Sequence, residues 1–370
     1  IALQPQGLKR VQALACAAAD HAAAPWQLGA RNYLALAAGH LLLSWWEAGF
    51  AVLAESGAGA GQPLAQAYSR FRQLAADAEY FYLIAGAVDG LSAVLAIDRR
   101  SQRCQVLAGG EWLLPVAQVS RPQALRFATS GGETCHGFFY PPHNPACRGP
   151  VASKPPLLVF VHGGPTSACY PTFDPRIQFW TQRGFAVADL NYRGSSNFGR
   201  AYRLRLQGAW GEVEVVDAEA LVGHLSEQGW IDPARAFIRG ASAGGFTTLC
   251  ALAFGRMFAG GASLYGVSDP LSLRRSTHKF EGDYLDWLLG DPQQHAERYQ
   301  ARTPLFFFQG GLDAVVLPAQ TECMVAALRS RGVAVEYHCY ADERHGFRQA
   351  AHLAHALEAE LGFYRQLLSS

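Results

Sequence analysis

The sequence carries almost no net charge and contains no long apolar run. Of its 370 residues, 31 are Lys or Arg and 30 are Asp or Glu, so the formal net charge is +1. This balance offers no electrostatic basis for binding nucleic acid or an anionic membrane. No apolar run approaches the ~20 residues that a membrane-spanning helix requires. We therefore expect neither nucleic acid nor a membrane among the partners of this protein.

Cysteine pairs at metal-ligand spacing are absent too. The eight cysteines are scattered, and none forms a Cys-x-x-Cys motif. In a chain of this length the pattern indicates reduced thiols and a cytoplasmic location. The first residue is Ile1 rather than Met, so we expect the natural N-terminus, with any signal peptide, to lie outside this sequence.

The most informative motif in the sequence is a glycine-flanked serine. Gly240-Ala241-Ser242-Ala243-Gly244 follows a short apolar run, 236–238, and precedes an apolar segment without proline, 246–254. Strand, sharp turn and helix is the context of a nucleophile elbow, which exposes the serine hydroxyl above a helix N-terminus. Side chains at positions 240 and 244 would collide with the neighbouring strand and helix, which explains the two glycines. The alternative interpretation is a Gly/Ser-rich loop between two core elements.

Residues 1–120 form a region of short apolar runs separated by glycines, which predicts a β-rich domain. Its turn signals, near Gly49 and at Asp89-Gly90, lie about 40 residues apart, which fits the repeat of a propeller blade. We expect a partial or reduced β-propeller, with an unrelated small β-domain as the alternative. A helix over Ala13–Ala24 is also compatible with the sequence, although a propeller would not predict it.

Residues 121–370 change to apolar strands that alternate with amphipathic helices. This pattern predicts an α/β-hydrolase fold, that is, a mostly parallel sheet with helices on both faces. Across the whole chain, strands are expected at 33–36, 41–46, 50–54, 80–87, 91–98, 124–129, 134–140, 157–161, 186–190, 236–239, 261–265, 304–309 and 333–340, and helices at 177–183, 213–228, 242–254, 318–330 and 348–368.

Two further residues follow Ser242 in the order serine, acid, histidine that α/β-hydrolases share. Asp313 lies in a glycine-rich loop after the apolar run 306–309, and His345 lies in the loop after the last predicted strand. Open α/β sheets place their sites at the carboxyl ends of the strands. The sequence therefore predicts that these three residues meet at one edge of the sheet.

Other residues offer alternatives to these assignments. Asp269 follows the predicted strand 261–265 and could replace Asp313 as the acid. On the last predicted helix, His352, His355 and Glu358 are spaced so that they share one face. A metal pair is conceivable there, but we favour a solvated helix face and expect no metal site.

The segment His162-Gly163-Gly164-Pro165 follows the predicted strand 157–161. In α/β-hydrolases this loop supplies one backbone N–H to the oxyanion hole, and the residue after the nucleophile supplies the other. We therefore expect Gly163 or Gly164, together with Ala243, to donate these hydrogen bonds. A turn without a catalytic role is the alternative, which we disfavour beside an elbow.

These motifs together resemble the prolyl oligopeptidase family of serine peptidases, close to its acylaminoacyl-peptidase and dipeptidyl-peptidase branches. The resemblance covers residues 121–370 and implies Ser242 as nucleophile, Asp313 as acid and His345 as base. It also implies an N-terminal propeller that restricts access to small peptides. The matching stretches are His162–Pro165, Asn191–Ser195 with Gly199, Trp210-Gly211, Gly240–Gly245, Gly310–Val316 with Pro318, and Glu343–Phe347.

The sequence departs from this family in two respects. The family propeller usually has about seven blades, whereas the residues before Arg121 can hold only two or three. In addition, we find no Glu-Glu pair of the kind that anchors a free N-terminus in the dipeptidyl branch. The mode of exopeptidase cleavage therefore stays open.

The sequence thus predicts a serine hydrolase that cleaves short peptides or acyl-peptides through an acyl-enzyme, without a cofactor. A carboxylesterase uses the same machinery, and a non-catalytic binding protein on this fold is a further alternative. The oligomeric state stays open, a homo-oligomer included.

We expect the substrate pocket in a long loop at Leu264–Leu289, which carries Tyr265, Phe280 and Tyr284. Long loops above the sheet of a compact domain are often functional. The alternative is that these aromatic side chains only pack the segment onto the core. His162 and Arg193 are further candidates for substrate binding.

Overall fold

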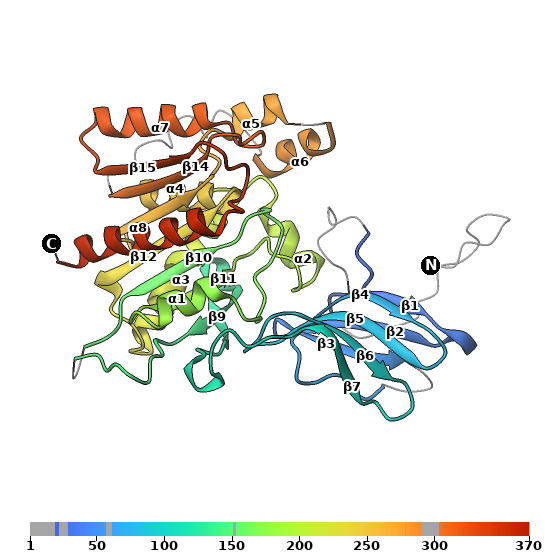
Figure 1. Cartoon of the computed structure of the whole chain (residues 1–370). Coiled ribbons are helices and arrows are strands. Elements are labelled where there is room, and N and C mark those ends of the chain that lie inside the picture. The colour runs from blue at the N-terminus through green and yellow to red at the C-terminus, as the bar shows by residue number, and fades with distance from the viewer. Residues whose placement is uncertain are drawn as a thin grey trace.

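The computed structural model describes residues 19–21, 29–56, 61–150, 153–277, 279–289 and 303–369. Within these ranges the strands form three sheets, two near the N-terminus and one large sheet in the remainder of the chain (Figure 1). The predicted helix over residues 13–24 lies mostly outside this description. Of its residues, the structure describes 19–21, where Asp20 forms a β-bridge with Trp46.

The two N-terminal sheets are antiparallel and share one apolar core. Leu42 and Leu53 of the first sheet pack with Phe71, Phe81 and Leu95 of the second. This arrangement confirms the predicted partial, propeller-like region. The first sheet contains β1 (Tyr33–Ala35), β2 (Leu41–Glu47) and β3 (Phe50–Ser56), and the second contains β4 (Arg70–Ala76), β5 (Tyr80–Gly86), β6 (Ala93–Asp98) and β7 (Cys104–Gly109).

Both predicted turns join antiparallel strands, although the one at Asp89-Gly90 is longer than expected. Ala48 and Gly49 adopt φ values of 49° and 84° between β2 and β3, as a tight hairpin requires. Asp89 and Gly90 lie in the connection 87–92 between β5 and β6, which is longer than the two-residue hairpin turn that an Asp-Gly pair favours. A contact with a distant segment stabilises this connection, since the N–H of Leu91 donates to Glu111 O.

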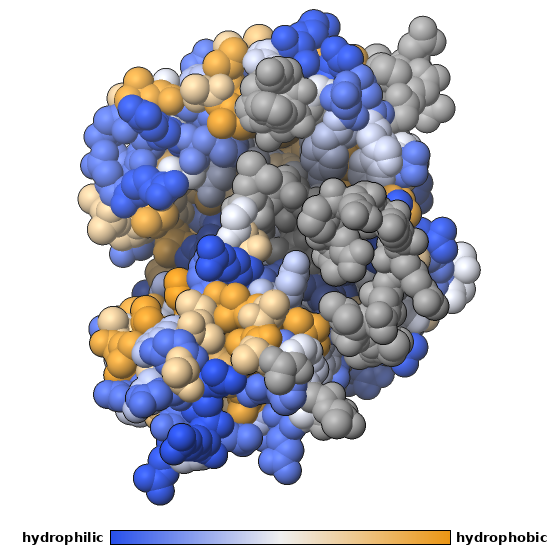
Figure 2. All heavy atoms as spheres, turned by 90° about the vertical axis from the view of Figure 1, so that its right-hand side faces the viewer, coloured by the Kyte–Doolittle hydropathy of each residue, from blue (hydrophilic) through white to orange (hydrophobic). Residues whose placement is uncertain are grey.

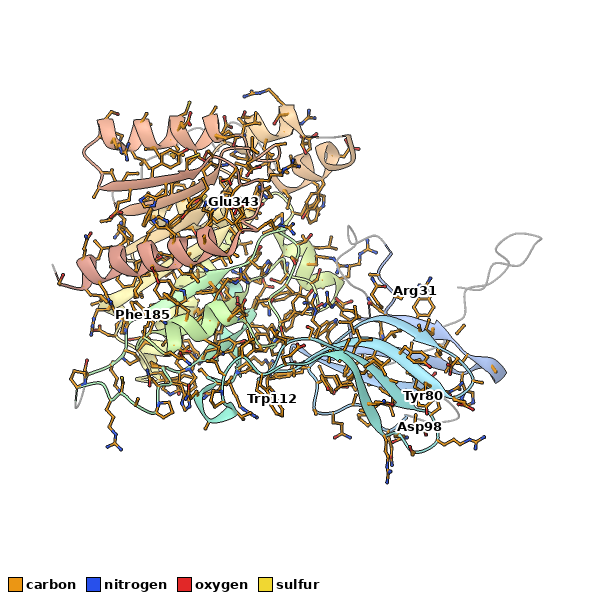
Figure 3. The ribbon with its side chains drawn as sticks, in the orientation of Figure 1. Arg31, Tyr80, Asp98, Trp112, Phe185 and Glu343 are labelled. Atoms are coloured by element: carbon orange, nitrogen blue, oxygen red, sulfur yellow. The ribbon has the colours of Figure 1, made fainter. Side chains whose placement is uncertain are left out.

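Strand β7 was not predicted, since its residues are exposed and carry no apolar periodicity. Figure 2 shows hydrophobic side chains gathered on the lower half of the molecule, where the N-terminal sheets lie. Figure 3 places Arg31 on the upper side of these sheets and Tyr80 and Asp98 on the lower side. The exposed large hydrophobic residues of this region are Tyr33, Val94, Val106, Leu107, Trp112, Leu113 and Val116.

The large sheet has the order β15-β14-β13-β12-β10-β11-β9-β8. Strands β10 to β15 are parallel, β9 is antiparallel to β11, and β8 is antiparallel to β9. The predicted mostly parallel sheet is therefore confirmed. Its strands are β8 (Gln123–Ala128), β9 (Thr134–Tyr140), β10 (Leu157–Val161), β11 (Ala186–Asn191), β12 (Ala236–Ala241), β13 (Gly260–Leu264), β14 (Leu305–Gly310) and β15 (Val335–Tyr340).

Helices cover both faces of this sheet (Figure 1). On one face, α1 and α8 enclose a core that includes Trp180, Phe237 and Tyr364. On the other face, α3, α4 and α7 enclose a core that includes Leu221 and Phe246. None of the described helices has both the length and the apolar character needed to cross a membrane. The helices are α1 (Pro175–Thr181), α2 (Arg200–Arg203), α3 (Val213–Glu227), α4 (Ala243–Phe254), α5 (Pro270–Ser276), α6 (Lys279–Leu289), α7 (Pro318–Ser330) and α8 (Ala350–Ser369).

The segment at Leu264–Leu289, expected as a long loop, instead contains α5 and α6. Asp269 caps the first turn of α5, because its side chain accepts a hydrogen bond from the N–H of Ser272. Trp287, on α6, packs against the core beneath α3 and α4. Tyr284 and Trp287 thus lie on α6, whereas Tyr265 precedes α5. Neither helix was predicted from the sequence.

The N-terminal sheets contact the α/β part through β9 and through the segment that follows β10. The Trp46 and Tyr170 rings lie 5.3 Å apart, and the Ser69 hydroxyl donates to Pro171 O at 2.6 Å. The rings of Phe50 and Phe138 meet edge-on at 5.6 Å. The two parts are thus joined by apolar packing and hydrogen bonds between residues far apart in the sequence.

A buried ion pair ties α8 to the centre of the large sheet. Arg239 Nε, from β12, donates to Glu360 Oε1 at 2.8 Å, and the Tyr364 hydroxyl donates to the same oxygen at 3.0 Å. The side chains of Arg239 and Glu360 are 8% and 0% exposed. Because each charge is removed from water, each depends on the other for compensation.

Replacing Glu360 by Ala should lower the free energy of unfolding by about 3–5 kcal/mol, because it leaves a buried guanidinium without its carboxylate. Chemical denaturation measures the difference. The control is Asp286→Ala, which breaks the exposed pair with Arg274 and should have little effect, since water screens that pair. Equal losses in the two variants would contradict the special role of the buried pair.

Candidate active site

Ser242 lies in a strained turn between β12 and α4. Its φ and ψ are 55° and −121°, a combination that residues other than glycine rarely adopt and that often marks a functional site. The backbone on both sides holds this conformation. The N–H of Ser242 donates to Leu264 O, and the carbonyl of Ser242 accepts from the N–H groups of Gly245 and Val267. The predicted elbow is therefore present.

The glycines that flank Ser242 are required by close backbone contacts. A Cβ at Gly240 would lie 2.1 Å from Gly244 O, and a Cβ at Gly244 would lie 2.3 Å from Val161 O. The first contact is with α4 and the second is with β10. The collisions expected from the sequence are therefore confirmed, and no side chain fits at either position.

The structure brings Ser242, His345 and Asp313 together at the carboxyl edge of the sheet. His345 Nε2 lies 2.9 Å from Ser242 Oγ, and His345 Nδ1 lies 2.9 Å from Asp313 Oδ2. The imidazole therefore connects the serine hydroxyl to the carboxylate. The ring of Tyr265 meets the His345 ring edge-on at 5.1 Å and supports its other side.

The Asp313 carboxylate is buried and held in place by the backbone. Its Oδ1 accepts the N–H groups of Val315 and Val316, each at 2.9 Å, and Gln309 Nε2 lies 3.3 Å from Oδ2. These donors orient the carboxylate and leave Oδ2 directed at His345. The competing acid, Asp269, instead serves as the cap of α5.

The His162–Pro165 loop is anchored by the His162 side chain. His162 Nδ1 lies 2.8 Å from Gly163 O, and because a carbonyl can only accept, Nδ1 carries the hydrogen. Burial lowers the pKa of His162 to about 4, so the ring is neutral and Nε2 accepts from the Ser195 hydroxyl at 2.7 Å. Stacking on Tyr192 at 4.4 Å also holds the ring. Both ring nitrogens are thus used to position the loop.

This loop brings Gly163 next to the elbow. The position of a Cβ on Gly163 is 3.5 Å from Ser242 Cβ and 3.8 Å from Ala243 N. Ala243 is the first residue of α4, so its N–H has no acceptor within the helix. Gly164 has a φ of 121°, and a Cβ there would lie 2.6 Å from Ser167 N. The arrangement has the backbone elements that an oxyanion hole needs.

The other predicted substrate-binding residues do not gather at one place. The hydroxyl of Tyr284 pairs with Thr166 Oγ1 at 2.7 Å, beside the His162–Pro165 loop. Arg193 lies away from the serine, where its Nε donates to Asp217 Oδ1 at 2.9 Å and its Nη1 pairs with Glu133 at 3.2 Å. The side chain of Phe280 lies outside the described part of the chain.

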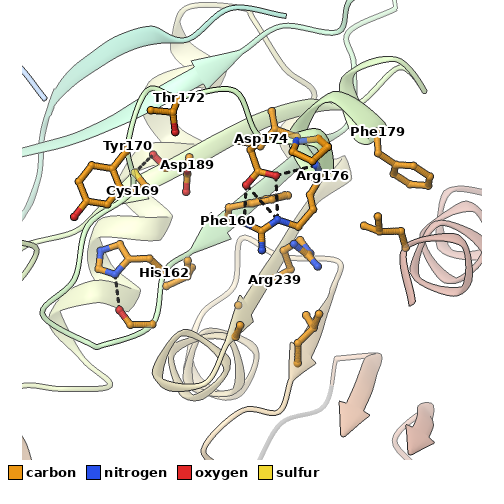
Figure 4. A pocket seen from close by; sticks show the side chains of 18 of the residues that line it. Phe160, His162, Cys169, Tyr170, Thr172, Asp174, Arg176, Phe179, Asp189 and Arg239 are labelled. Atoms are coloured by element: carbon orange, nitrogen blue, oxygen red, sulfur yellow. Dashed lines mark hydrogen bonds and ion pairs between the residues drawn. The ribbon is translucent and has the colours of Figure 1, made fainter. Parts of the chain in front are cut away.

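A cavity of about 870 Å³ opens beside the elbow, on the face of the sheet that α1 and α8 cover. It extends from Ala241 and Tyr265 to Tyr170, near the N-terminal sheets, and Figure 4 shows part of its wall. Figure 2 shows that the surface is hollowed between the N-terminal sheets and the α/β part. The charged residues that line the cavity are Arg70, Asp174, Arg176, Asp189 and Arg239.

Sequence reasoning missed these charged residues. Asp189 could have been identified from the sequence, because a carboxylate within the apolar run predicted as strand 186–190 is unusual and indicates a buried polar group. Burial, with a smaller contribution from the charge of Asp174, raises the pKa of Asp189 to about 7. Asp174 itself forms forked hydrogen bonds with Arg176. A carboxyl group with a raised pKa in the wall of this cavity was not foreseen.

The raised pKa of Asp189 makes the stability depend on pH. Between about pH 4 and pH 7 the carboxyl is protonated in the folded protein and ionised in the unfolded chain, so the folded state loses stability as pH rises. Asn cannot ionise. The stability of Asp189→Asn relative to wild type should therefore grow by about 1–3 kcal/mol across this range.

Denaturant titrations of wild type and variant at several pH values measure this change. Asp98→Asn is the control, because hydrogen bonds from Ser101 hold the pKa of Asp98 below its ordinary value. Its stability difference should not grow over the same range. A pH-independent difference for Asp189→Asn would show that this carboxyl is ionised in the folded protein.

Comparison with known proteins links this site to one family. Residues 171–370 match the sequence model of the prolyl oligopeptidase family. Over 210 residues the chain is 31% identical to dipeptidyl peptidase family member 6 of Caenorhabditis elegans. This alignment covers 52% of this chain and 28% of that protein.

Solved structures match over a longer stretch. A puromycin-hydrolyzing peptidase of Mycobacterium tuberculosis aligns with a TM-score of 0.91 and 37% identity over 96% of this chain and 56% of that one. A puromycin hydrolase aligns with a TM-score of 0.89 and 34% identity, over 94% of this chain and 55% of that one. The chain thus spans about half the length of these solved relatives and less than a third of the nematode protein.

Proposed function

Because the chain belongs to the prolyl oligopeptidase family, we propose that it acts as a serine peptidase on short peptides or acyl-peptides. The observation that carries the proposal is the hydrogen-bonded series from Ser242 through His345 to Asp313, with 2.9 Å at each step. A hydroxyl, an imidazole and a buried carboxylate in this order form an activated nucleophile. The peptidases among its relatives support the choice of an amide bond.

In this proposal His345 takes the proton from Ser242 as the serine oxygen attacks the substrate carbonyl. The imidazolium then gives the proton to the leaving amine, and water hydrolyses the acyl-enzyme by the same route. Asp313 fixes the tautomer of His345 and stabilises its positive charge. The backbone N–H groups of Ala243 and of Gly163 or Gly164 stabilise the oxyanion. None of these steps needs a cofactor.

The division of the chain at about residue 120 is part of this proposal. Residues 121–370 would carry the catalytic machinery, and residues 1–120 would limit access to it. The contacts of Trp46, Ser69 and Phe50 with the α/β part support such a role. The described cysteines are free thiols, which supports the further proposal of a cytoplasmic location.

The acyl side of the substrate is assigned to the segment that contains α5 and α6. Tyr284 supports this assignment, because its hydroxyl contacts Thr166 in the loop that leads from the oxyanion donors. A carboxylesterase is the alternative function, since esters and amides use the same groups. Comparing acyl-aminoacyl anilides with plain short-chain esters distinguishes the two.

Ser242→Ala should abolish hydrolysis of acyl-aminoacyl anilides and labelling by a fluorophosphonate probe, because both reactions need the serine oxygen. The thermal melt should change little, since the turn is held by backbone contacts. Wild type labelled in parallel provides the reference. Labelling of the Ala variant at the wild-type rate would refute Ser242 as the nucleophile.

Asp313→Asn should lower turnover by about 10⁴-fold, because the amide cannot hold His345 in the required tautomer. Asp269→Asn is the matched control, since Asp269 caps a helix and should affect turnover far less. Steady-state kinetics on one anilide substrate measures both. A larger loss of turnover in Asp269→Asn than in Asp313→Asn would show that Asp269, after β13, is the acid.

A further inference from the structure

The cavity beside the elbow contains one arginine without a carboxylate partner among the described residues. Three arginines line this cavity. Arg176 is bound by Asp174, and Arg239 is bound by Glu360. Arg70, from β4, forms no ion pair with any residue that the structure describes. An anion that entered the cavity would therefore find one cation whose charge is not already compensated.

Arg70 is held rigidly in this position. Its guanidinium lies over the ring of Tyr170, with the central carbon 3.4 Å from the ring centroid. Such stacking fixes the plane of the guanidinium, and its N–H groups, which point outward in that plane, exceed what one interaction with the Tyr170 side chain can use. Burial lowers the pKa of Arg70, Tyr170 partly offsets this effect, and the charge of Arg72 adds to it. These are the features of a cation that would gain from an anionic ligand.

The surroundings of Arg70 are basic. A second cavity, of about 220 Å³, adjoins the first and shares Arg70 and Tyr170 with it. Arg31 and Arg72 line it as well, and none of its described lining residues is acidic. This end of the combined cavity therefore attracts negative charge. Asp189, whose pKa is raised to about 7, interacts with the charges of Asp174 and Arg176. Figure 4 shows it beside Cys169 on the wall of the larger cavity.

The opposite end of the larger cavity is lined by neighbours of the proposed reacting groups. Tyr265 lines it and touches the His345 ring. Phe347 lines it too, two residues after His345. Because His345 gives its proton to the leaving amine, the leaving fragment departs on the side of this ring. The acyl side is assigned to the α5–α6 segment, whose Tyr284 does not line this cavity.

We propose that the cavity binds the leaving fragment of a short peptide and that Arg70 binds the free α-carboxylate at the end of that fragment. This inference rests on the proposed peptidase function. Guanidinium and carboxylate match in shape and form two parallel hydrogen bonds. Arg70 is then a specificity residue that selects short peptides by their C-terminus, and the N-terminal sheets supply part of the substrate site.

The test compares three substrates on the full chain: acetyl-Phe-Gly-Gly with a free carboxylate, the same peptide with a C-terminal amide, and acetyl-Phe-Gly-Asp amide. Wild type should prefer the free carboxylate in kcat/KM. In Arg70→Gln the ratio of free acid to amide should fall by about 10- to 100-fold, because a hydrogen bond between charged groups is lost. Arg70→Lys should retain part of the ratio.

Arg99→Gln is the matched control. Arg99 also lies over an aromatic ring, that of Phe81 at 4.9 Å, but it forms an ion pair with Glu55. Arg99 lines neither of the two cavities that contain Arg70. Its ratio should equal that of wild type. The proposal is overturned if wild type does not distinguish the free acid from the amide, or if Arg70→Gln keeps the wild-type ratio. Cleavage of the Asp-containing amide as fast as the free acid would assign Arg70 to an acidic side chain instead.

A binding measurement separates this proposal from the proposed function. Calorimetry with Ser242→Ala should show that Gly-Gly binds more tightly than glycyl-glycinamide, and that adding Arg70→Gln removes the difference. If wild type neither cleaves a peptide nor reacts with a fluorophosphonate, the peptidase function fails. The calorimetric difference still decides the role of Arg70, because binding needs no hydrolysis. Equal binding of the two dipeptides would refute it.

Discussion

Close backbone packing at the elbow is the constraint on which the candidate site depends. Gly240 meets α4 and Gly244 meets β10 at distances that exclude any side chain. This contact forces the chain to reverse within a few residues, so Ser242 takes a strained conformation with φ of 55°. The same contact brings the His162–Pro165 loop against the first residue of α4. The proposed nucleophile and the proposed oxyanion donors therefore depend on one packing requirement.

The second constraint is the compensation of buried charge. The α1/α8 face of the sheet carries Arg239 and Asp189 in otherwise apolar strands. Arg239 is neutralised by Glu360 from α8, whereas Asp189 has its pKa raised to about 7 by burial. An ion pair and a raised pKa thus each reduce the cost of burying a charged group in the wall of one cavity. They leave Arg70 as the cation on which a ligand carboxylate could act.

The N-terminal sheets contribute to the site as well as to the fold. Arg70, the first residue of β4, and Ser69, just before it, reach the segment 170–171, where a guanidinium–ring contact and a hydrogen bond join the two parts. A cavity that begins beside Tyr265, whose ring contacts His345, therefore ends on a different sheet. If this region limits the length of the substrate, it does so with a specific charge as well as by obstruction.

Local patterns in the sequence determined the elbow, the order of Ser242, Asp313 and His345, and the mostly parallel sheet. Those features depend on neighbours in the chain: glycines that avoid backbone collisions, and apolar runs that end in polar loops. Only the tertiary structure decided that the segment after β13 forms two helices, that Arg193 is held by Asp217, and that Arg70 faces the cavity. Each depends on partners distant in sequence, as with Arg239 and Glu360, which are 121 positions apart. A local pattern carries no information about such partners, because burial and pairing are set only when the layers pack.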